Sequence, residues 1–163
     1  MELPNRKKNR LPNFDYGSGG YYFITICTKG RKCILSKIIV GEGSTLPRLT
    51  LHGEIVKKYI SSIPQKYPNV ISDKYVIMPD HIHLILGIKN DGRDDPSPTV
   101  SNVVGWLKYN ITKEINVICG ENGTSIFQRS YYDHVIRNQH DYDETWYYID
   151  NNPINWIMKH QND

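Results

Sequence analysis

The stretch YVIMPDHIHLILGI, residues 75–88, decides the fold of this chain. β-branched and aliphatic residues run through it and are interrupted once, by Pro79 and Asp80. This pattern predicts two strands, over 70–78 and 81–88, joined by a tight hairpin turn.

His81 and His83 flank one aliphatic residue in the second of these strands. Alternate side chains of a strand share a face, so both imidazoles point the same way, with Cα atoms roughly 7 Å apart. Two imidazoles on one rigid face can converge on a single metal ion, and two solvated strand histidines are the alternative for this pattern alone. The opposite face is expected to enter the core with Ile82, Leu84 and Leu86.

The remaining elements follow from hydrophobic spacing and from the positions of glycine and proline. Their order indicates an α+β fold, close to the ferredoxin-like arrangement of one antiparallel sheet with helices packed on one face, plus a C-terminal helix. The predicted elements are strands over 21–28 and 33–40, a helix over 53–63 that ends just before Pro64, a helix over 99–117, an extended segment over 126–136, and a last helix over 141–151 stopped by Pro153.

The chain has 163 residues and a net charge of +3, which suits a single domain and permits a polyanionic partner without requiring one. We expect a basic N-terminal arm over 1–20 and one domain over 21–163. The three cysteines match no zinc-finger spacing, and no apolar stretch is long enough for a membrane span or a signal peptide. These features favour a cytoplasmic protein with no membrane partner.

The last predicted helix offers a nucleophile. Tyr147 has the acidic neighbours Asp143 and Asp150 one turn away, whereas the neighbours of Tyr148 at that distance include Thr145 and Asn152. Tyr148 is therefore better suited to meet a polyanion. The buried stripe of this helix is expected to consist of Tyr142, Trp146 and Ile149.

If this helix covers the sheet face that bears His81 and His83, Tyr148 approaches a bound ion and Asn152 supplies an oxygen ligand. Two neutral imidazoles and one amide leave the full charge of a dipositive ion for substrate oxygens. This favours Mg²⁺ or Mn²⁺ acting as a Lewis acid on a phosphodiester.

Three segments of the chain resemble the single-tyrosine HUH transposases, and in particular the REP-associated tyrosine transposases. YVIMPDHIHLILGI resembles the HUH motif, FDYGSGGYYFITICTKGRKC (14–33) is similar to the start of that group, and FQRSYYDHVIRNQHDYDETWYYIDNNPINW (127–156) is similar to its tail. The resemblance implies a ferredoxin-like nuclease that cuts single-stranded DNA next to a hairpin. The HUH histidines then fall on His81 and His83, the nucleophile on Tyr148, where a 5′-phosphotyrosine forms, and the third metal ligand on Asn152, a position at which some relatives carry Gln. Asp80 precedes the HUH pair where relatives often have Asn or Glu, a departure that puts none of the catalytic residues in doubt.

Contacts to the DNA backbone are expected from basic side chains, because charge neutralisation dominates affinity for nucleic acids. The candidates are Arg6, Lys7, Lys8, Arg10, Arg31, Lys32, Lys108, Lys113, Arg129 and Arg137. A homodimer that exchanges its last helices is left open. The alternatives are a non-catalytic nucleic-acid-binding module of RRM-like fold and a structural protein with incidental histidines, whereas a histidine-triad hydrolase is disfavoured because position 85 is Ile.

Overall fold

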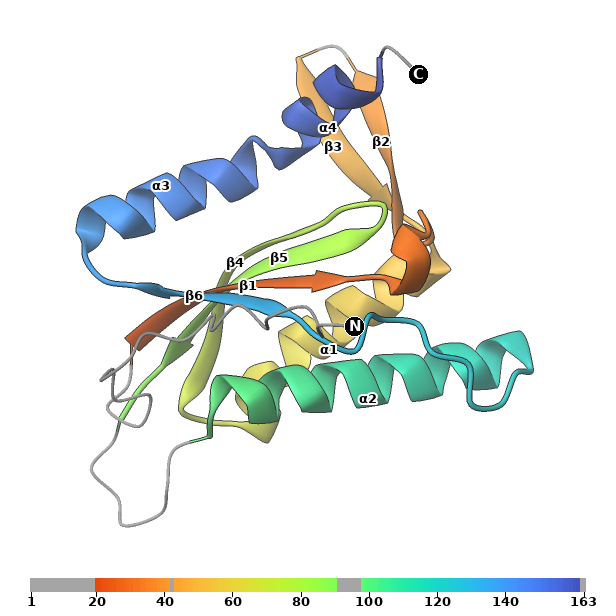
Figure 1. The fold of residues 1–163 in the computed structure, drawn as a ribbon, viewed down its shortest axis with the longest axis horizontal. Helices are drawn as coiled ribbons and strands as arrows, with labels where there is room; N and C mark the ends of the chain where they lie inside the picture. The colour runs from red at the N-terminus through yellow and green to blue at the C-terminus, as the bar shows by residue number, and fades with distance from the viewer. Residues whose placement is uncertain (1–19, 42, 91–97, 162–163) are drawn as a thin grey trace, which may run out of the picture.

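The computed structural model describes residues 20–41, 43–90 and 98–161 of the chain. Its centre is a four-stranded antiparallel sheet in the order β4-β5-β1-β6 (Figure 1). The strands are β1 (Gly20–Cys27), β4 (Val70–Ile77), β5 (His81–Ile88) and β6 (Tyr132–Ile136). Along the chain, helix α1 (Leu51–Lys66) lies between β1 and β4, and helix α2 (Val100–Cys119) lies between β5 and β6. This is the predicted ferredoxin-like arrangement.

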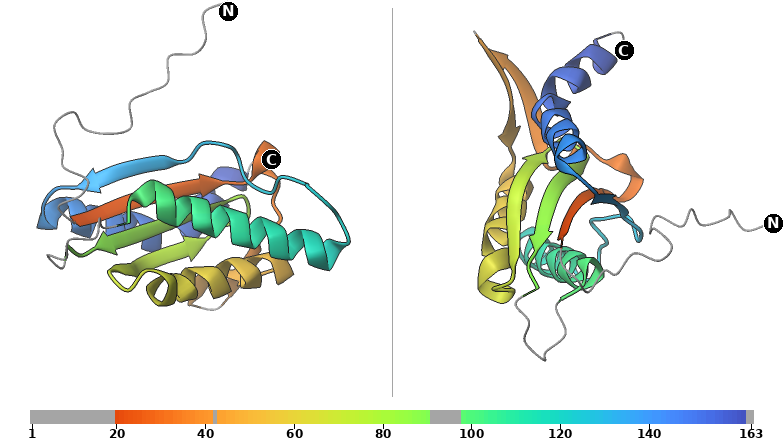
Figure 2. Two further views of the ribbon diagram at one scale, coloured as in Figure 1. Left: turned by 90° about the horizontal axis from the view of Figure 1, so that it is seen from below. Right: turned by 90° about the vertical axis from the view of Figure 1, so that its left-hand side faces the viewer.

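The two faces of the sheet are covered by different helices. Helices α1 and α2 lie on one face, and α3 (Gln139–Asp150) lies on the other, followed by α4 (Asn152–His160) (Figure 2). The prediction of helices on one face plus a separate C-terminal helix is therefore confirmed.

The hydrophobic core fills the space between the sheet and α1 and α2. Side chains on one face of β5 alternate into it, as expected for Ile82, Leu84 and Leu86. Helix α2 adds the apolar stripe that its spacing predicts, with Val100, Val103, Val104, Leu107, Ile111 and Ile115 all buried. Both helices begin at a threonine N-cap, Thr50 for α1 and Thr99 for α2, whose side chain accepts a backbone N–H of the first turn.

The predicted strand over 33–40 does not join the main sheet. It corresponds to β2 (Ser36–Gly41), which pairs with β3 (Ser44–Leu49) in a two-stranded antiparallel hairpin. The second strand of this hairpin was not predicted, because Pro47 and the glycines around it are typical of loops. An edge strand tolerates proline since one side of its backbone needs no ladder partner.

Helix α1 does not end before Pro64 but continues through it to Lys66. Proline has no backbone N–H, so it cannot donate to the carbonyl of Ile60 four residues earlier. The Ser72 hydroxyl of β4 lies 3.5 Å from that carbonyl oxygen and donates to it instead. A partner from the sheet therefore helps the helix to accommodate the proline.

The C-terminal region also differs from the prediction. Pro153 does not stop the last helix: α3 ends at Asp150, and Pro153 lies in the first turn of the separate helix α4. Proline is favoured at this position because its fixed φ suits a helix start. The extended segment predicted over 126–136 contains the strand β6 only over its last five residues, preceded by an isolated bridge between Thr28 and Phe127.

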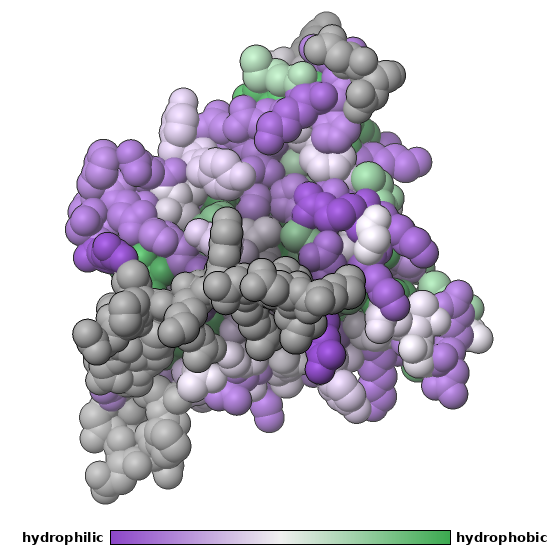
Figure 3. Space-filling view, in the orientation of Figure 1, coloured by the Kyte–Doolittle hydropathy of each residue, from purple (hydrophilic) through white to green (hydrophobic). Residues whose placement is uncertain are grey.

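The face of the molecule seen in Figure 3 is mostly hydrophilic, with hydrophobic residues in small patches. Within the described part of the chain, none of the helices has the length and apolar character needed to cross a membrane. The predicted basic arm, with Arg6, Lys7, Lys8 and Arg10, lies outside the described residues.

Candidate active site

A cleft of about 420 Å³ lies on the sheet face away from α1 and α2. His81 and His83 form its floor, with ring centroids 4.5 Å apart and exposed fractions of only 7% and 5%. The expectation that both imidazoles share one face of the strand is confirmed. Burial on a central strand holds the two rings rigidly side by side.

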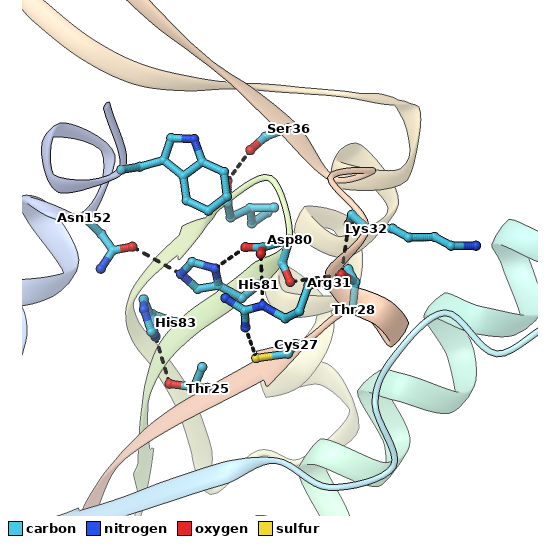
Figure 4. Close-up of polar contacts among 12 residues, drawn as sticks. Thr25, Cys27, Thr28, Arg31, Lys32, Ser36, Asp80, His81, His83 and Asn152 are labelled. Carbon is cyan, nitrogen blue, oxygen red and sulfur yellow. Dashed lines mark hydrogen bonds and ion pairs between the residues drawn. The ribbon is translucent and has the colours of Figure 1, made fainter. Parts of the chain in front are cut away.

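Each histidine is oriented through its Nδ1 atom. His81 Nδ1 lies 2.6 Å from Oδ1 of Asp80, and His83 Nδ1 lies 2.8 Å from Oγ1 of Thr25 (Figure 4). Thr25 can reach His83 because the two residues are direct partners in the β1–β5 register. In both rings Nε2 is therefore the nitrogen that can bind a metal ion.

The two histidines also differ in their surroundings. Burial, with smaller contributions from the nearby charges of His81 and Arg31, lowers the pKa of His83 to about 3. His83 is therefore a neutral imidazole at physiological pH. Neutral imidazole is the form that coordinates a metal ion.

Tyr148 reaches this cleft from the last turn of α3. Its ring centroid lies 5.3 Å from that of His83 and 6.0 Å from that of Phe23, and the side chain is 47% exposed. Tyr147, the neighbouring alternative, is 69% exposed and does not line the cleft. Tyr148 and both histidines belong to the same chain, so no exchange of helices is needed to bring them together.

Asn152 completes the group from the first turn of α4. Its side chain is buried, and its Oδ1 atom lies 3.2 Å from Nε2 of His81. Among the described residues, no three His, Cys, Asp or Glu side chains gather as a metal-binding group. The predicted ligand set of His81, His83 and Asn152 therefore depends on an amide as its third member.

The predicted buried stripe of α3 is only partly correct. Ile149 is fully buried, but the second buried residue is Thr145, and Trp146 is 39% exposed. The Trp146 ring lies beneath the ammonium group of Lys74, which is 3.8 Å from the ring centroid. Polar contacts take the place of an apolar stripe on this helix.

Two polar contacts hold α3 against β4. The Tyr142 hydroxyl donates to the Asp73 carboxylate, which raises the pKa of Tyr142 to about 12. Lys74, the residue over Trp146, also forms an ion pair of 2.9 Å with Asp150. The helix that carries Tyr148 is thus attached near both of its ends.

The basic residues predicted to contact DNA do not form one group. Arg31 lines the cleft, Lys32 and Arg129 are exposed, and Arg137 is exposed beside the start of α3. Lys108 lies on α2, and its ammonium group donates to the carbonyl oxygens of Gln128, Arg129 and Ser130. Its charge therefore holds the segment before β6 against α2. A DNA contact for Lys32, Lys113, Arg129 and Arg137 stays a prediction.

Sequence reasoning did not find several residues that shape the cleft. Thr25 was missed because strand register is invisible in a single sequence. Asp80 was given no role, and Trp156 and His160 of α4 were not considered because no helix was expected after Pro153.

Comparison with known proteins agrees with this fold and gives the family. The model of the family described as "Transposase IS200 like" matches residues 18–152. This chain belongs to the IS200-like transposase family. An uncharacterized protein of Haemophilus influenzae is 31% identical over 168 residues, a match that covers 94% of this chain and 91% of the relative.

Two solved structures of transposases share the fold of this family member. One is a REP-associated tyrosine transposase bound to a REP hairpin, with a TM-score of 0.59, 24% identity, and coverage of 90% of this chain and 73% of that one. The other is a putative transposase from Deinococcus radiodurans, with a TM-score of 0.50, 18% identity, and coverage of 87% and 95%. The family assignment supports a transposase-like function on DNA.

Proposed function

We propose that this transposase-family protein cleaves and transfers single-stranded DNA by transesterification, with Tyr148 as the nucleophile. The observation that carries the proposal is the meeting of Tyr148 with His81, His83 and Asn152 around one cleft. A phenol beside two buried imidazoles is an arrangement suited to attack on a phosphodiester.

The reaction balances without an external energy source. The Tyr148 hydroxyl gives up its proton as its oxygen bonds to phosphorus, and the bond from phosphorus to the 3′ oxygen breaks. The leaving oxygen takes up a proton to become a 3′-hydroxyl, so there is no net change in protons. The product is a 5′-phosphotyrosine. Attack by a second 3′-hydroxyl reverses the step and joins a different strand.

The residues present fit a divalent ion, Mg²⁺ or Mn²⁺. His81 and His83 would bind it through Nε2 because their Nδ1 atoms are engaged by Asp80 and Thr25. Asn152 would add its amide oxygen, which already lies beside His81. When bound, such an ion supplies Lewis-acid stabilisation of the negative charge on the phosphate. The chain itself holds the phenol of Tyr148 at the cleft and keeps His83 neutral.

Single-stranded DNA with a hairpin is the proposed partner. The proposal takes this from the REP-associated transposase that was solved with a REP hairpin, and 24% identity makes it an inference for this chain. The exposed basic residues Arg31, Lys32, Arg129 and Arg137 suit a phosphate backbone.

The test is to incubate the protein with Mn²⁺ and a single strand that carries a hairpin and a label at its 3′ end, because the fragment bound to Tyr148 keeps that end. We expect a covalent adduct that survives denaturant and depends on the divalent ion. Tyr148→Phe should form no adduct, whereas the matched Tyr147→Phe variant should form it normally. An adduct in Tyr148→Phe would move the nucleophile elsewhere, and DNA binding with no adduct in any variant would favour a non-catalytic nucleic-acid-binding module.

A further inference from the structure

Arg31 has an unusual backbone. Its φ of 54° places it in the left-handed region, and among the described residues it is the non-glycine position where φ is positive. Left-handed backbone costs free energy in residues with a Cβ atom and persists only where the surroundings hold it.

The surroundings of Arg31 fix its turn to the start of β5. The Arg31 N–H donates to the Thr28 carbonyl at 3.1 Å, and the Thr28 N–H donates to the Asp80 carbonyl at 2.9 Å. The hydroxyl of Thr28, a fully buried residue, lies 3.1 Å from the same Asp80 carbonyl. The backbones of Arg31 and Asp80 are therefore held in a fixed relation through Thr28.

The Asp80 carboxylate connects Arg31 to the histidine pair. One oxygen, Oδ1, accepts from His81 Nδ1 at 2.6 Å, and the other, Oδ2, accepts from Arg31 Nε at 3.0 Å (Figure 4). The carboxylate side chain is only 8% exposed. Because a carboxylate accepts and does not donate, a neutral His81 that keeps this contact carries its proton on Nδ1. The lone pair of Nε2 then faces the Oδ1 atom of Asn152 at 3.2 Å, and a cation bound by both atoms would relieve the repulsion between them.

The Arg31 side chain contacts Asp80 and also lines the cleft. It lines the cleft with Tyr148, and its side chain is 49% exposed. Its contacts with described residues use Nε toward Asp80 and Nη1 toward the Cys27 sulfur. Among the described residues the second amino group of the guanidinium has no partner, so it can meet a ligand, and a planar guanidinium suits the oxygens of a phosphate.

We propose that Asp80 and Arg31 act as a linked pair: Asp80 is a positioning residue that fixes the tautomer of His81, and Arg31 binds the non-bridging oxygens of the DNA phosphate in the cleft. The identity of that phosphate rests on the proposed function. One carboxylate then orients both the imidazole beneath the phosphate and the guanidinium beside it.

The first test concerns His81 alone and needs no metal, DNA or activity. Nitrogen NMR of the ¹⁵N-labelled protein at neutral pH should show His81 in the Nδ1–H tautomer. Asp80→Asn should produce a mixture of tautomers because an amide can both donate and accept, whereas the control Asp150→Asn should leave the His81 signals unchanged. A wild-type His81 with its proton on Nε2, or a tautomer that Asp80→Asn does not alter, would overturn the positioning role.

The second readout is Mn²⁺ affinity, measured by calorimetry on protein without DNA. Asp80→Asn should weaken binding by about 10- to 100-fold, the range found when the partner of a metal-binding histidine is lost. An affinity equal to that of Asp150→Asn would overturn the role.

The third test isolates Arg31. A hairpin-bearing single strand is titrated against Tyr148→Phe protein without divalent ions, and Arg31→Lys and Arg31→Gly are each compared with Lys29→Ala, an exposed charge in the same turn. Both Arg31 variants should lose at least about 10-fold more affinity than Lys29→Ala, since lysine lacks the planar donors. Equal losses would overturn the phosphate contact.

Arg31→Gly is chosen because glycine adopts the left-handed backbone without strain. If the Arg31→Gly protein unfolds because the Asp80 carboxylate has lost its cationic partner, the double variant Arg31→Gly with Asp80→Asn removes both charges. Its DNA affinity is then compared with that of Asp80→Asn alone. The outcomes separate the two ideas: absence of DNA cleavage by the wild type contradicts the proposed function, whereas normal cleavage with unchanged tautomer and affinities contradicts only this pair.

Discussion

The two faces of the central sheet are built on different principles. The face toward α1 and α2 is closed by aliphatic side chains such as Leu84 and Leu107, which exclude water completely. The face toward α3 buries His81, His83 and Asn152, which are held by hydrogen bonds and not by apolar packing. The difference implies that one face supplies most of the stability and the other holds the reactive groups, so substitutions should separate the two properties.

The largest expected effect is on the reactive face. Tyr148→Phe should abolish adduct formation, because phenylalanine has no oxygen that can bond to phosphorus. Its melting temperature should stay close to that of the wild type, because the 47% exposed side chain keeps its ring contacts with Phe23 and His83. Calorimetry beside the adduct assay checks both, and a large loss of stability would contradict the separation of the faces.

The next effect lies on the apolar face. Leu84→Ala should lower the free energy of unfolding by about 2–5 kcal/mol, since it removes a fully buried side chain and leaves a cavity. Urea denaturation measures this. The fraction that remains folded should still form the adduct, and a folded but inactive Leu84→Ala protein would show that the faces are coupled.

Acid should act on the reactive face through His83. Its pKa is about 3 in the folded protein against about 6.5 when unfolded, so between these values the unfolded chain binds a proton that the folded one does not. Stability is therefore full above pH 6.5 and falls as the pH drops toward 3, by roughly 2–3 kcal/mol from this group at pH 4.5. Denaturation at pH 7 and 4.5 should show a smaller difference for His83→Gln than for wild type, and identical pH profiles would contradict the assignment.

A smaller loss of stability is expected from Thr28, which links the turn of Arg31 to the turn before β5. Thr28→Val keeps the shape of a fully buried side chain but removes the hydroxyl that lies 2.9 Å from the Lys32 carbonyl and 3.1 Å from the Asp80 carbonyl. It should cost about 1.5 kcal/mol of unfolding free energy, because buried acceptors lose their donor. Chemical denaturation tests this, and Thr45→Val on the β2–β3 hairpin is the control.

The smallest effect concerns the attachment of α3 to β4. Lys74→Met removes the ion pair with Asp150 and the contact over the Trp146 ring, each worth up to about 1 kcal/mol where solvent screens it. Hydrogen exchange should show faster opening of α3 with little change in α1 and α2. Uniformly faster exchange would mean that α3 belongs to the same cooperative unit as the core.

The same contrast explains how far the fold could be predicted from sequence. Packing against an apolar core requires hydrophobic residues at regular spacing in the sequence. For this reason β5 and α2 were predicted nearly to their ends. Strand β3 has no such spacing, because Pro47 and the glycines before it resemble a loop and only pairing with β2 makes this segment a strand.

The candidate site was predictable where it depends on local geometry and not where it depends on tertiary contacts. The shared face of His81 and His83 follows from strand alternation alone, and the approach of Tyr148 followed from placing its helix on that face. The Thr25 partner of His83 depends on strand register, and the contact of Arg31 with Asp80 depends on a left-handed turn. Trp146 was misjudged as core because the ammonium group that covers its ring comes from a distant strand.

The break between α3 and α4 at Asn151 makes segment length a determinant of the site. Tyr148 and Asn152 are four residues apart yet belong to two helices, and Asn151, with φ −90° and ψ 0°, is the joint between them. One inserted or deleted residue on either side of this joint would rotate one side chain relative to the other by about 100°. Spacing at this joint is therefore expected to tolerate far less variation than the identity of the residues that flank it.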